Sequence, residues 1–201
     1  MHQKKHSKNK SNNRHQNNKV RITGGQLRGR ILTFATLDGL RPSGDRSRET
    51  LFNWLMPHIA ERRVLDAFAG SGILGFEALS RGARKVIFLD QSQKVTTQIN
   101  QYCQLFNQQA QSQIIQTDTL TWLENCSKSF DLIFLDPPFA ADSCQQLLNI
   151  IQNQKLLNKN GLIYLEQDKS ALPLSESNNW HILKQKEMGQ VRLTLISFDL
   201  N

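Results

Sequence analysis

Short apolar runs alternate with longer amphipathic stretches along most of the chain. The runs have the length of strands, and the stretches between them repeat apolar residues at the spacing of a helix. Predicted strands cover Val64 to Phe68, Lys85 to Asp90, Gln113 to Thr117, Phe130 to Leu135, Gly161 to Glu166, His181 to Lys186 and Val191 to Phe198. Predicted helices cover Ile73 to Ser80, Gln93 to Asn107, Leu120 to Asn125 and Asp142 to Asn153.

This alternation predicts the fold class. Continuous apolar strands separated by helices are typical of a parallel sheet with helices on both faces. The last two strands are joined by a short turn at Met188-Gly189-Gln190, and so short a connection requires antiparallel pairing. We therefore predict an α/β, Rossmann-like fold whose seven-stranded sheet is mostly parallel, with an antiparallel edge strand.

The first sixty residues follow a different pattern. Alternating apolar residues on either side of a turn at Gly24-Gly25-Gln26 predict a small hairpin. A loop at residues 41–45 precedes a predicted helix, with Asp45 as its N-cap and apolar residues on one face. Arginines of these segments are expected to be exposed, and they are Arg21, Arg28, Arg30, Arg46 and Arg48.

The positive charge of the chain is concentrated at one end. The chain has 201 residues and a formal net charge of +8; residues 1–37 hold nine Lys and Arg and no acid, while residues 38–201 are nearly neutral. Such an asymmetry favours a polyanionic partner, most often nucleic acid. Residues 1–19 have no apolar residue after Met1 and are predicted to be a disordered basic tail. Residues 20–60 are then an extension facing the nucleic acid, and residues 61–201 the α/β domain.

The composition argues against a membrane protein, a disulfide-linked protein and a metalloprotein. The longest apolar runs are too short to cross a bilayer, which needs roughly 20 residues, so we expect no membrane protein. The cysteines at 103, 126 and 144 are widely spaced and odd in number, which argues against a disulfide framework and a CxxC metal site. No His, Cys or Asp cluster has the spacing of metal ligands. We expect a cytoplasmic protein without a bound metal.

The segment from Asp66 to Gly75 is the first candidate site. It reads Asp-Ala-Phe-Ala-Gly-Ser-Gly-Ile-Leu-Gly, leaves a predicted strand, turns tightly and opens a helix. Glycines are needed there because a Cβ would block a ligand that lies against the backbone. Twenty residues after Gly70, Asp90 ends the next strand, where its carboxylate can accept hydrogen bonds from both ribose hydroxyls. The arrangement predicts an adenosine-containing cofactor.

NAD and S-adenosylmethionine both use this architecture. A carboxylate as close to the helix N-terminus as Asp66 would repel a pyrophosphate, but it would attract the ammonium group of S-adenosylmethionine. Asp118, at the end of the third strand, can recognise an adenine amino group or serve as an N-cap, and the sequence leaves both roles open. The residues expected to bind the cofactor are Asp66, Phe68, Gly70, Ser71, Gly72, Asp90 and Asp118.

The second candidate site is Asp136-Pro137-Pro138-Phe139, which directly follows an apolar strand. Ligands of open α/β sheets bind at the carboxyl ends of the strands, and two successive prolines stiffen the loop. The Asp136 carboxylate and the Pro137 carbonyl can accept both hydrogens of an exocyclic amine, while Phe139 stacks on the base. The motif predicts methyl transfer to a planar amino group, and a tight turn after a buried strand is its structural alternative.

The two motifs together resemble the class I S-adenosylmethionine-dependent methyltransferases that act on exocyclic amines. The N-terminal segments are similar to those of one bacterial family, the 16S rRNA (guanine(966)-N(2))-methyltransferases. The residues that carry this similarity are Arg21-Ile22-Thr23-Gly24-Gly25, Arg28-Gly29 and residues 41–55. The similarity extends from residue 20 almost to the end of the chain. Ser43 and Ser47 depart from the family pattern, and neither lies in the two motifs.

The resemblance implies the reaction, the cofactor and the partner. It implies a methyltransferase domain at residues 61–201 that uses S-adenosyl-L-methionine and modifies guanine N2 of 16S rRNA, in the 30S subunit or a late assembly intermediate. The catalytic residues would be Asp136, Pro137 and Phe139. The RNA contacts would be Arg21, Arg28, Arg30, Arg41, Arg46 and Arg48. We expect a monomer.

Other functions remain open at this point. The same motif would serve a methyltransferase of adenine N6 or of a protein glutamine, since each presents a planar amino group. A non-catalytic ribosome-assembly factor can share the fold, although the intact glycine loop and amine motif argue against it. An NAD dehydrogenase would leave Pro137 and Pro138 without a role and shows no catalytic His or Lys in context.

Overall fold

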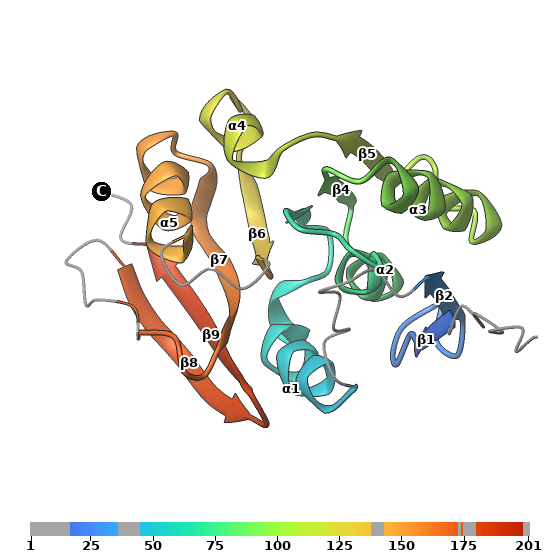
Figure 1. Cartoon of the computed structure of the whole chain (residues 1–201), viewed down its shortest axis with the longest axis horizontal. Coiled ribbons are helices and arrows are strands. Elements are labelled where there is room, and N and C mark those ends of the chain that lie inside the picture. Colours follow the sequence, from blue (N-terminus) through green and yellow to red (C-terminus); the bar gives the residue numbers. More distant parts are fainter. Residues whose placement is uncertain (1–16, 36–44, 138–142, 173, 175–179, 199–201) are drawn as a thin grey trace, which may run out of the picture.

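The computed structural model describes residues 17–35, 45–137, 143–172, 174 and 180–198, which form two sheets and their covering helices (Figure 1). The strands are β1 (Asn17–Arg21), β2 (Ile31–Ala35), β3 (Arg63–Asp66), β4 (Lys85–Asp90), β5 (Ser112–Gln116), β6 (Phe130–Leu135), β7 (Leu157–Asp168), β8 (Trp180–Met188) and β9 (Val191–Phe198). The helices are α1 (Asp45–Leu55), the 3-10 turn η1 (Met56–His58), α2 (Ile73–Ser80), α3 (Gln93–Leu105), α4 (Thr119–Glu124) and α5 (Ser143–Asn153).

The large sheet confirms the predicted topology. Its seven strands run in the order β5-β4-β3-β6-β7-β9-β8, and β3 to β7 pair in parallel. The antiparallel strand is β9, which lies one position in from the edge and pairs with both β7 and the edge strand β8. The chain proceeds outward from β3 to β4 and β5 and then returns to β6 on the other side of β3. The switch point of the sheet therefore lies between β3 and β6.

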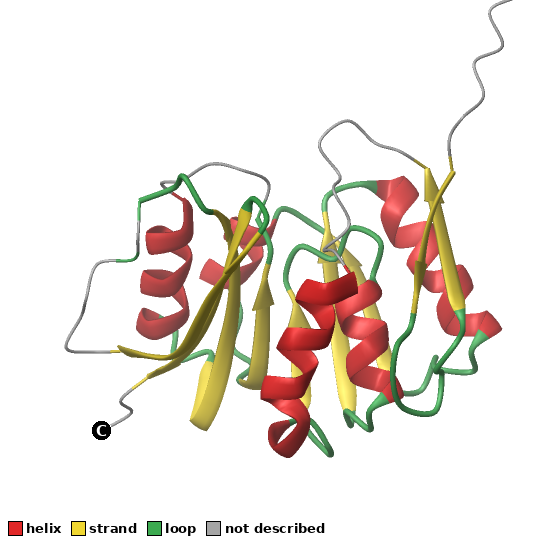
Figure 2. Ribbon diagram, turned by 90° about the horizontal axis from the view of Figure 1, so that it is seen from below, coloured by secondary structure: helices red, strands yellow, loops and turns green. Residues whose placement is uncertain are grey.

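Helices cover both faces of this sheet, as the alternating pattern predicts (Figure 2). One apolar cluster joins the sheet to α1, α2 and α3, with Phe52, Phe76 and Ile99 buried in it. The second cluster joins the opposite face to α4 and α5 through Leu123 and Leu148. Burial of side chains of this size contributes about 1.5–3 kcal/mol each, so the two clusters hold the sheet between its helices. No helix among the described residues is long and apolar enough to span a membrane.

The hairpin of β1 and β2 packs against α2 and α3 at one side of the molecule (Figure 1). Ile22 and Leu32 are fully buried in the first apolar cluster. The backbone N–H of Thr33 donates to the hydroxyl of Tyr102 on α3 at 2.6 Å, and the Thr33 carbonyl accepts from the same hydroxyl at 3.0 Å. The extension thus shares its core with the α/β domain.

Most predicted boundaries lie within two residues of those in the structure, and two differ by three residues or more. β1 begins at Asn17 and pairs with β2 from there, so the predicted end of the tail at residue 19 lies three residues too late. Its first residues are polar and give no apolar alternation, and the strand is formed by backbone pairing. β7 begins at Leu157, because Phe130 pairs with Leu157 before a bulge shifts the register. The polar residues 158–160 hide this part of β7 from pattern analysis.

A Gly75→Ala substitution tests how closely α2 packs on β4. An ideal Cβ at Gly75 would lie 2.1 Å from Cε1 of Phe88, and Phe88 is fully buried. We expect the added methyl to lower the free energy of unfolding by about 1–3 kcal/mol, as overpacked core sites do. Urea unfolding measures this, with Thr97→Ala on the exposed side of α3 as the control within about 0.5 kcal/mol of wild type. Equal stability of both variants would contradict the close packing.

Candidate active site

The two sequence motifs meet at the switch point of the sheet. Asp66 ends β3 and pairs in register with Phe134 of β6, two residues before Asp136. Beyond the strand, the N–H of Ala67 donates to the Phe134 carbonyl at 3.1 Å, and the N–H of Ala69 donates to the Leu89 carbonyl at 2.9 Å. The glycine loop is therefore fixed between the ends of β4 and β6, which is where open α/β sheets bind ligands.

The glycine loop makes a tight turn into α2. Gly70 and Gly72 have φ angles of 50° and 77°, in the left-handed region that favours glycine. The N–H of Gly72 donates to the Ala69 carbonyl at 2.7 Å, and the Ser71 hydroxyl accepts from the N–H of Ile73 at 3.4 Å. A Cβ at Gly72 would come within 3.0 Å of the Phe76 ring, so backbone angle and packing already require glycine there, besides any need to leave room for a ligand.

Asp90 ties the end of β4 to this loop. One carboxylate oxygen accepts from the N–H of Gly70 at 3.0 Å, and the other accepts from the N–H of Ser92 at 2.8 Å. Burial raises the pKa of Asp90 above its usual value, against the lowering effect of these two hydrogen bonds. A carboxylate oxygen can accept two hydrogen bonds, so Asp90 keeps capacity for the ribose hydroxyls that the sequence predicts as its partners.

Asp66 lies beneath the N-terminus of α2. Its side chain is buried and accepts from the N–H of Gly75 at 3.0 Å. Burial raises its pKa to about 7, the Gly75 hydrogen bond opposes the rise, and the negative charge of Asp90 adds to it. The observed partner of Asp66 is thus the helix, and its attraction for an ammonium group stays a prediction.

Asp118 forms the N-cap of α4, which is one of the two roles that its position suggests. One carboxylate oxygen accepts from the backbone N–H and the hydroxyl of Thr121, both at 2.9 Å. These bonds lower the pKa of the exposed Asp118 carboxyl. Thr119 connects the same turn to the glycine loop, because its hydroxyl donates to the Ala67 carbonyl at 2.5 Å. Phe68 is half-buried against the second apolar cluster.

Asp136 and Pro137 follow β6 at the same edge, half-buried and buried, respectively. Pro138 and Phe139 of the motif lie outside the described residues. Leu135 pairs with Leu165, so the neighbouring position on β7 is Glu166. Glu166 is buried and accepts from the Tyr164 hydroxyl at 2.7 Å. The pKa of Tyr164 is raised well above its usual value by burial and by the negative charges of Glu166 and Asp136.

Glu166 therefore lies beside the candidate site, although neither sequence motif includes it. Its sequence signal is weak, since it is an acid at the end of one of several apolar strands. Its position beside Asp136 depends on the pairing of β7 with β6, which the sequence pattern does not specify.

The arginines of the extension divide into two groups. Arg21, Arg28, Arg30 and Arg46 are exposed, as predicted. Arg48 is not: its side chain is fully buried and pairs with Asp45 at 2.8 Å. The prediction for Arg48 is wrong because the first turn of α1 lies against the hairpin, where Arg48 also donates to the Arg21 carbonyl at 3.0 Å. Asp45 is the first helical residue and accepts from Arg48. Arg41 lies outside the described residues.

Among the described residues, no group of three or more His, Cys, Asp or Glu side chains gathers in a way that could hold a metal ion.

The sheet order, the glycine loop at its switch point and the acid that ends β4 define the class I methyltransferase fold. The chain belongs to the family described as conserved hypothetical protein 95, whose model matches residues 20–197. It is 44% identical over 179 residues to a ribosomal RNA small subunit methyltransferase D of Haemophilus influenzae, covering 88% of this chain and 92% of the relative. The protein of the same name in Escherichia coli is 36% identical, with 88% of each covered.

Solved structures agree with this placement. A putative methyltransferase from Escherichia coli superimposes with a TM-score of 0.82 at 33% identity, over 92% of this chain and 100% of the other. A putative methylase from Haemophilus influenzae gives a TM-score of 0.77 at 40% identity, with the same coverage. The fold and its family are thus shown by sequence and by structure.

The raised pKa of Asp66 predicts a pH-dependent stability. Because the folded-state pKa of about 7 lies above the value in the unfolded chain, the folded protein binds more protons between about pH 4 and 7. The free energy of unfolding should therefore fall as the pH rises through this range, by an amount on the order of 4 kcal/mol from Asp66.

Asp66→Asn removes this titration and keeps an acceptor for the N–H of Gly75. Urea unfolding of wild type and variant at pH 5 and pH 8 measures the effect. We expect the pH dependence of the variant to be clearly shallower. Parallel pH profiles would show that Asp66 titrates near its ordinary value.

Proposed function

We propose that the protein transfers a methyl group from S-adenosyl-L-methionine to the exocyclic N2 of a guanine in 16S rRNA. The resemblance noted in the sequence implies that this is guanine 966. The observation that carries the proposal is the position of Asp136 and Pro137 beside the glycine loop at one switch point. The names of the relatives, rRNA small subunit methyltransferases, support the choice of rRNA.

The residues of the loop fit a cationic, adenosine-containing group. Gly70 and Gly72 present backbone without side chains, and Asp90 offers acceptor oxygens at the adjoining strand end. Asp66 and Asp90 both have raised pKa values, so a positive charge nearby would favour their ionised forms. When bound, S-adenosyl-L-methionine supplies an electrophilic methyl group. Asp90 would hold the ribose, and the charges of Asp66 and Asp90 would hold the ammonium and sulfonium end.

The role of Asp136 and Pro137 follows from the chemistry of a guanine amine. The N2 lone pair is delocalised into the ring, so N2 is a poor nucleophile while it stays planar. Two acceptors, the Asp136 carboxylate and the Pro137 carbonyl, hold both N2 hydrogens and favour the pyramidal form. The target base must first leave its stack, at a cost of a few kcal/mol. Asp136 or a water takes the proton that the amine loses after transfer.

Positioning supplies most of the rate in this scheme. Methyl transfer from a sulfonium donor would create no net charge, because the positive charge would move to N2, beside the Asp136 carboxylate, until the amine proton is removed. Orienting the amine and the donor in one site converts a bimolecular step into an effectively unimolecular one. The rigid glycine loop and the proline after Asp136 serve this purpose.

The decisive experiment identifies the methylated product. The purified protein receives radiolabelled S-adenosyl-L-methionine and 30S particles, naked 16S rRNA, DNA or protein fractions from a strain that lacks its gene. We expect N2-methylguanosine from the 30S fraction. Label in N6-methyladenine or in methylglutamine would keep the amine chemistry and refute the substrate. Cofactor binding without transfer to any fraction would favour a ribosome-assembly factor.

Asp136→Ala separates the amine site from the cofactor site. We expect methyl transfer to fall below detection, because N2 loses an acceptor that pyramidalises it, while the Kd of S-adenosyl-L-methionine changes less than about threefold. Single-turnover transfer and calorimetry measure the two effects. Glu124→Ala, an exposed acid on α4, is the control with full activity. If Asp136→Ala loses cofactor binding, Asp136 belongs to the cofactor site, and its proposed role at the amine is wrong.

The basic N-terminal segment should strengthen RNA binding through counterion release. Because β1 begins at Asn17, the deletion that leaves the hairpin intact removes residues 2–16, which contain five Lys and Arg. We expect the plot of log affinity against log salt to become shallower by about 0.7–0.9 for each phosphate that the segment neutralises. Filter binding to 30S particles at several salt concentrations measures the slope. An unchanged slope would exclude an electrostatic role for the segment.

A further inference from the structure

Glu77 is a buried acid in the middle of an apolar helix. α2 has the sequence Ile-Leu-Gly-Phe-Glu-Ala-Leu-Ser and is buried along its whole length, with Glu77 fully inaccessible to solvent. A buried charge costs several kcal/mol unless close partners compensate it, and uncharged residues of similar size often give equal or greater stability. Neither helix formation nor the cofactor loop requires an acid at this position. Its partners therefore indicate its role.

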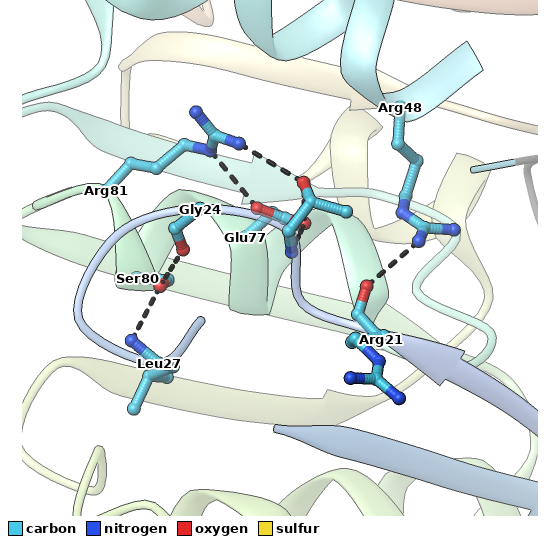
Figure 3. A network of polar contacts seen from close by, with 8 residues as sticks. Arg21, Gly24, Leu27, Arg48, Glu77, Ser80 and Arg81 are labelled. Atoms are coloured by element: carbon cyan, nitrogen blue, oxygen red, sulfur yellow. Dashed lines mark hydrogen bonds and ion pairs between the residues drawn. The ribbon is translucent and has the colours of Figure 1, made fainter. Parts of the chain in front are cut away.

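Those partners belong to the extension. The Glu77 carboxylate accepts from the backbone N–H of Thr23 and, at 2.7 Å, from the Thr23 hydroxyl. Its other oxygen accepts from Nε of Arg81 at 3.1 Å. Figure 3 shows Glu77 and Arg81 reaching the loop that follows β1. Glu77 thus binds the first residues of the loop between β1 and β2.

Ser80, one turn further along α2, holds the rest of this loop. Its hydroxyl donates to the Gly24 carbonyl and accepts from the N–H of Leu27 at 2.8 Å (Figure 3). Its backbone carbonyl accepts from the N–H of Gln26 at 2.7 Å. Gly25 has a φ of 74°, and a Cβ there would lie 1.8 Å from the Ser80 carbonyl oxygen. The loop therefore lies in direct backbone contact with the C-terminal end of α2.

Arg81 and Arg48 extend the network to α1. The Arg81 guanidinium lies 4.9 Å from the centroid of the Phe52 ring, and one of its nitrogens donates to the Thr23 hydroxyl at 3.3 Å. Arg48 donates from α1 to the Arg21 carbonyl (Figure 3). The hairpin loop and α1 are thereby held to the same end of α2. Exposed arginines lie on both of them, at positions 21, 28, 30 and 46.

We propose that Glu77, with Ser80, is a positioning residue that sets the exposed arginines of the extension in a fixed place relative to the cofactor loop. α2 begins at the glycine loop and ends at this network, and its eight residues span about 12 Å. RNA bound to the arginines is then held at a defined position relative to Asp136. The inference rests on the proposed function, since it assumes that RNA is the partner of these arginines.

The test measures binding of 30S particles and cofactor separately for Glu77→Gln and Ser80→Ala. Gln keeps an acceptor for Thr23 but loses the charge that pairs with Arg81, and Ala removes both hydrogen bonds of the hydroxyl to the loop. We expect the Kd and KM for 30S particles to rise about fivefold to tenfold, with the Kd of the cofactor within about twofold of wild type. Glu124→Gln, on the opposite face of the sheet, is the matched control.

A general loss of stability would also weaken activity, so each substitution is repeated in a chain with all four exposed arginines, Arg21, Arg28, Arg30 and Arg46, replaced by Ala. If Glu77 acts through the arginines, Glu77→Gln should have no further effect on 30S binding in that background. Three outcomes would overturn the inference. The first is an equal loss of 30S affinity with and without the arginines. The others are an unchanged 30S affinity when the arginines are present, and a weakened cofactor affinity. If Glu77→Gln fails to fold, Ser80→Ala carries the same comparison.

The outcome is separable from that of the proposed function. Affinity for 30S particles is read by filter binding and needs no methyl transfer. If wild type binds 30S particles but leaves guanine N2 unmethylated, the proposed reaction fails while the positioning role is still measured. If wild type does not bind 30S particles, the RNA partner itself is refuted, and the positioning inference fails with it.

Discussion

The pairing of β3 with β4 on one side and β6 on the other is the constraint on which the site depends. It creates the switch point at which the loop after β3 and the motif after β6 lie side by side. The hydrogen bonds continue past the strand ends, through Ala67 to β6 and through Ala69 to β4. As a result, the proposed cofactor loop and the proposed amine acceptors are fixed in place by one set of peptide groups.

Acidic residues gather at this edge of the sheet, and their charges affect both stability and cofactor binding. Asp66 and Asp90 end β3 and β4, Asp136 follows β6, and Glu166 lies at the neighbouring position of β7. Burial raises the pKa of Asp66 and Asp90. Acids collected at a strand edge oppose folding as they ionise, and a cationic ligand would relieve that cost. The same charges therefore make the protein on its own less stable and the binding of a positive cofactor more favourable. The acidic edge therefore lowers the stability of the folded protein at the place where it favours a cationic ligand.

The sequence pattern predicts most of the sheet, because buried strands and amphipathic helices have distinct periods. It predicts the glycine loop from the spacing of the glycines between a strand and a helix. In the structure, Gly70 and Gly72 occupy left-handed positions that other residues rarely adopt. It fails where the structure depends on contacts between distant segments. Arg48 looks like an exposed basic residue but is buried because α1 lies on the hairpin. The start of β7 is hidden by the polar residues 158–160, which lie at the bulge between Leu157 and the rest of the strand, and Glu166 acquires its position only through the order of the strands.

Glu77 is the clearest case of that limit. In the sequence it is one acid in a predicted helix, and only Arg81, four residues further along, has the spacing of a helical ion pair. Its other partner, Thr23, gives no signal of pairing. The hairpin loop and α2 have to fold together before its carboxylate can bind Thr23, because Thr23 lies 54 residues away. Such a contact contributes little to a helix but fixes the angle at which a second element docks. The short helix α2 thus has two constrained ends, the glycine loop at its start and the arginine-bearing extension at its finish. A helix so short and so deeply buried transmits the position of one end to the other, because it has no freedom to bend between them.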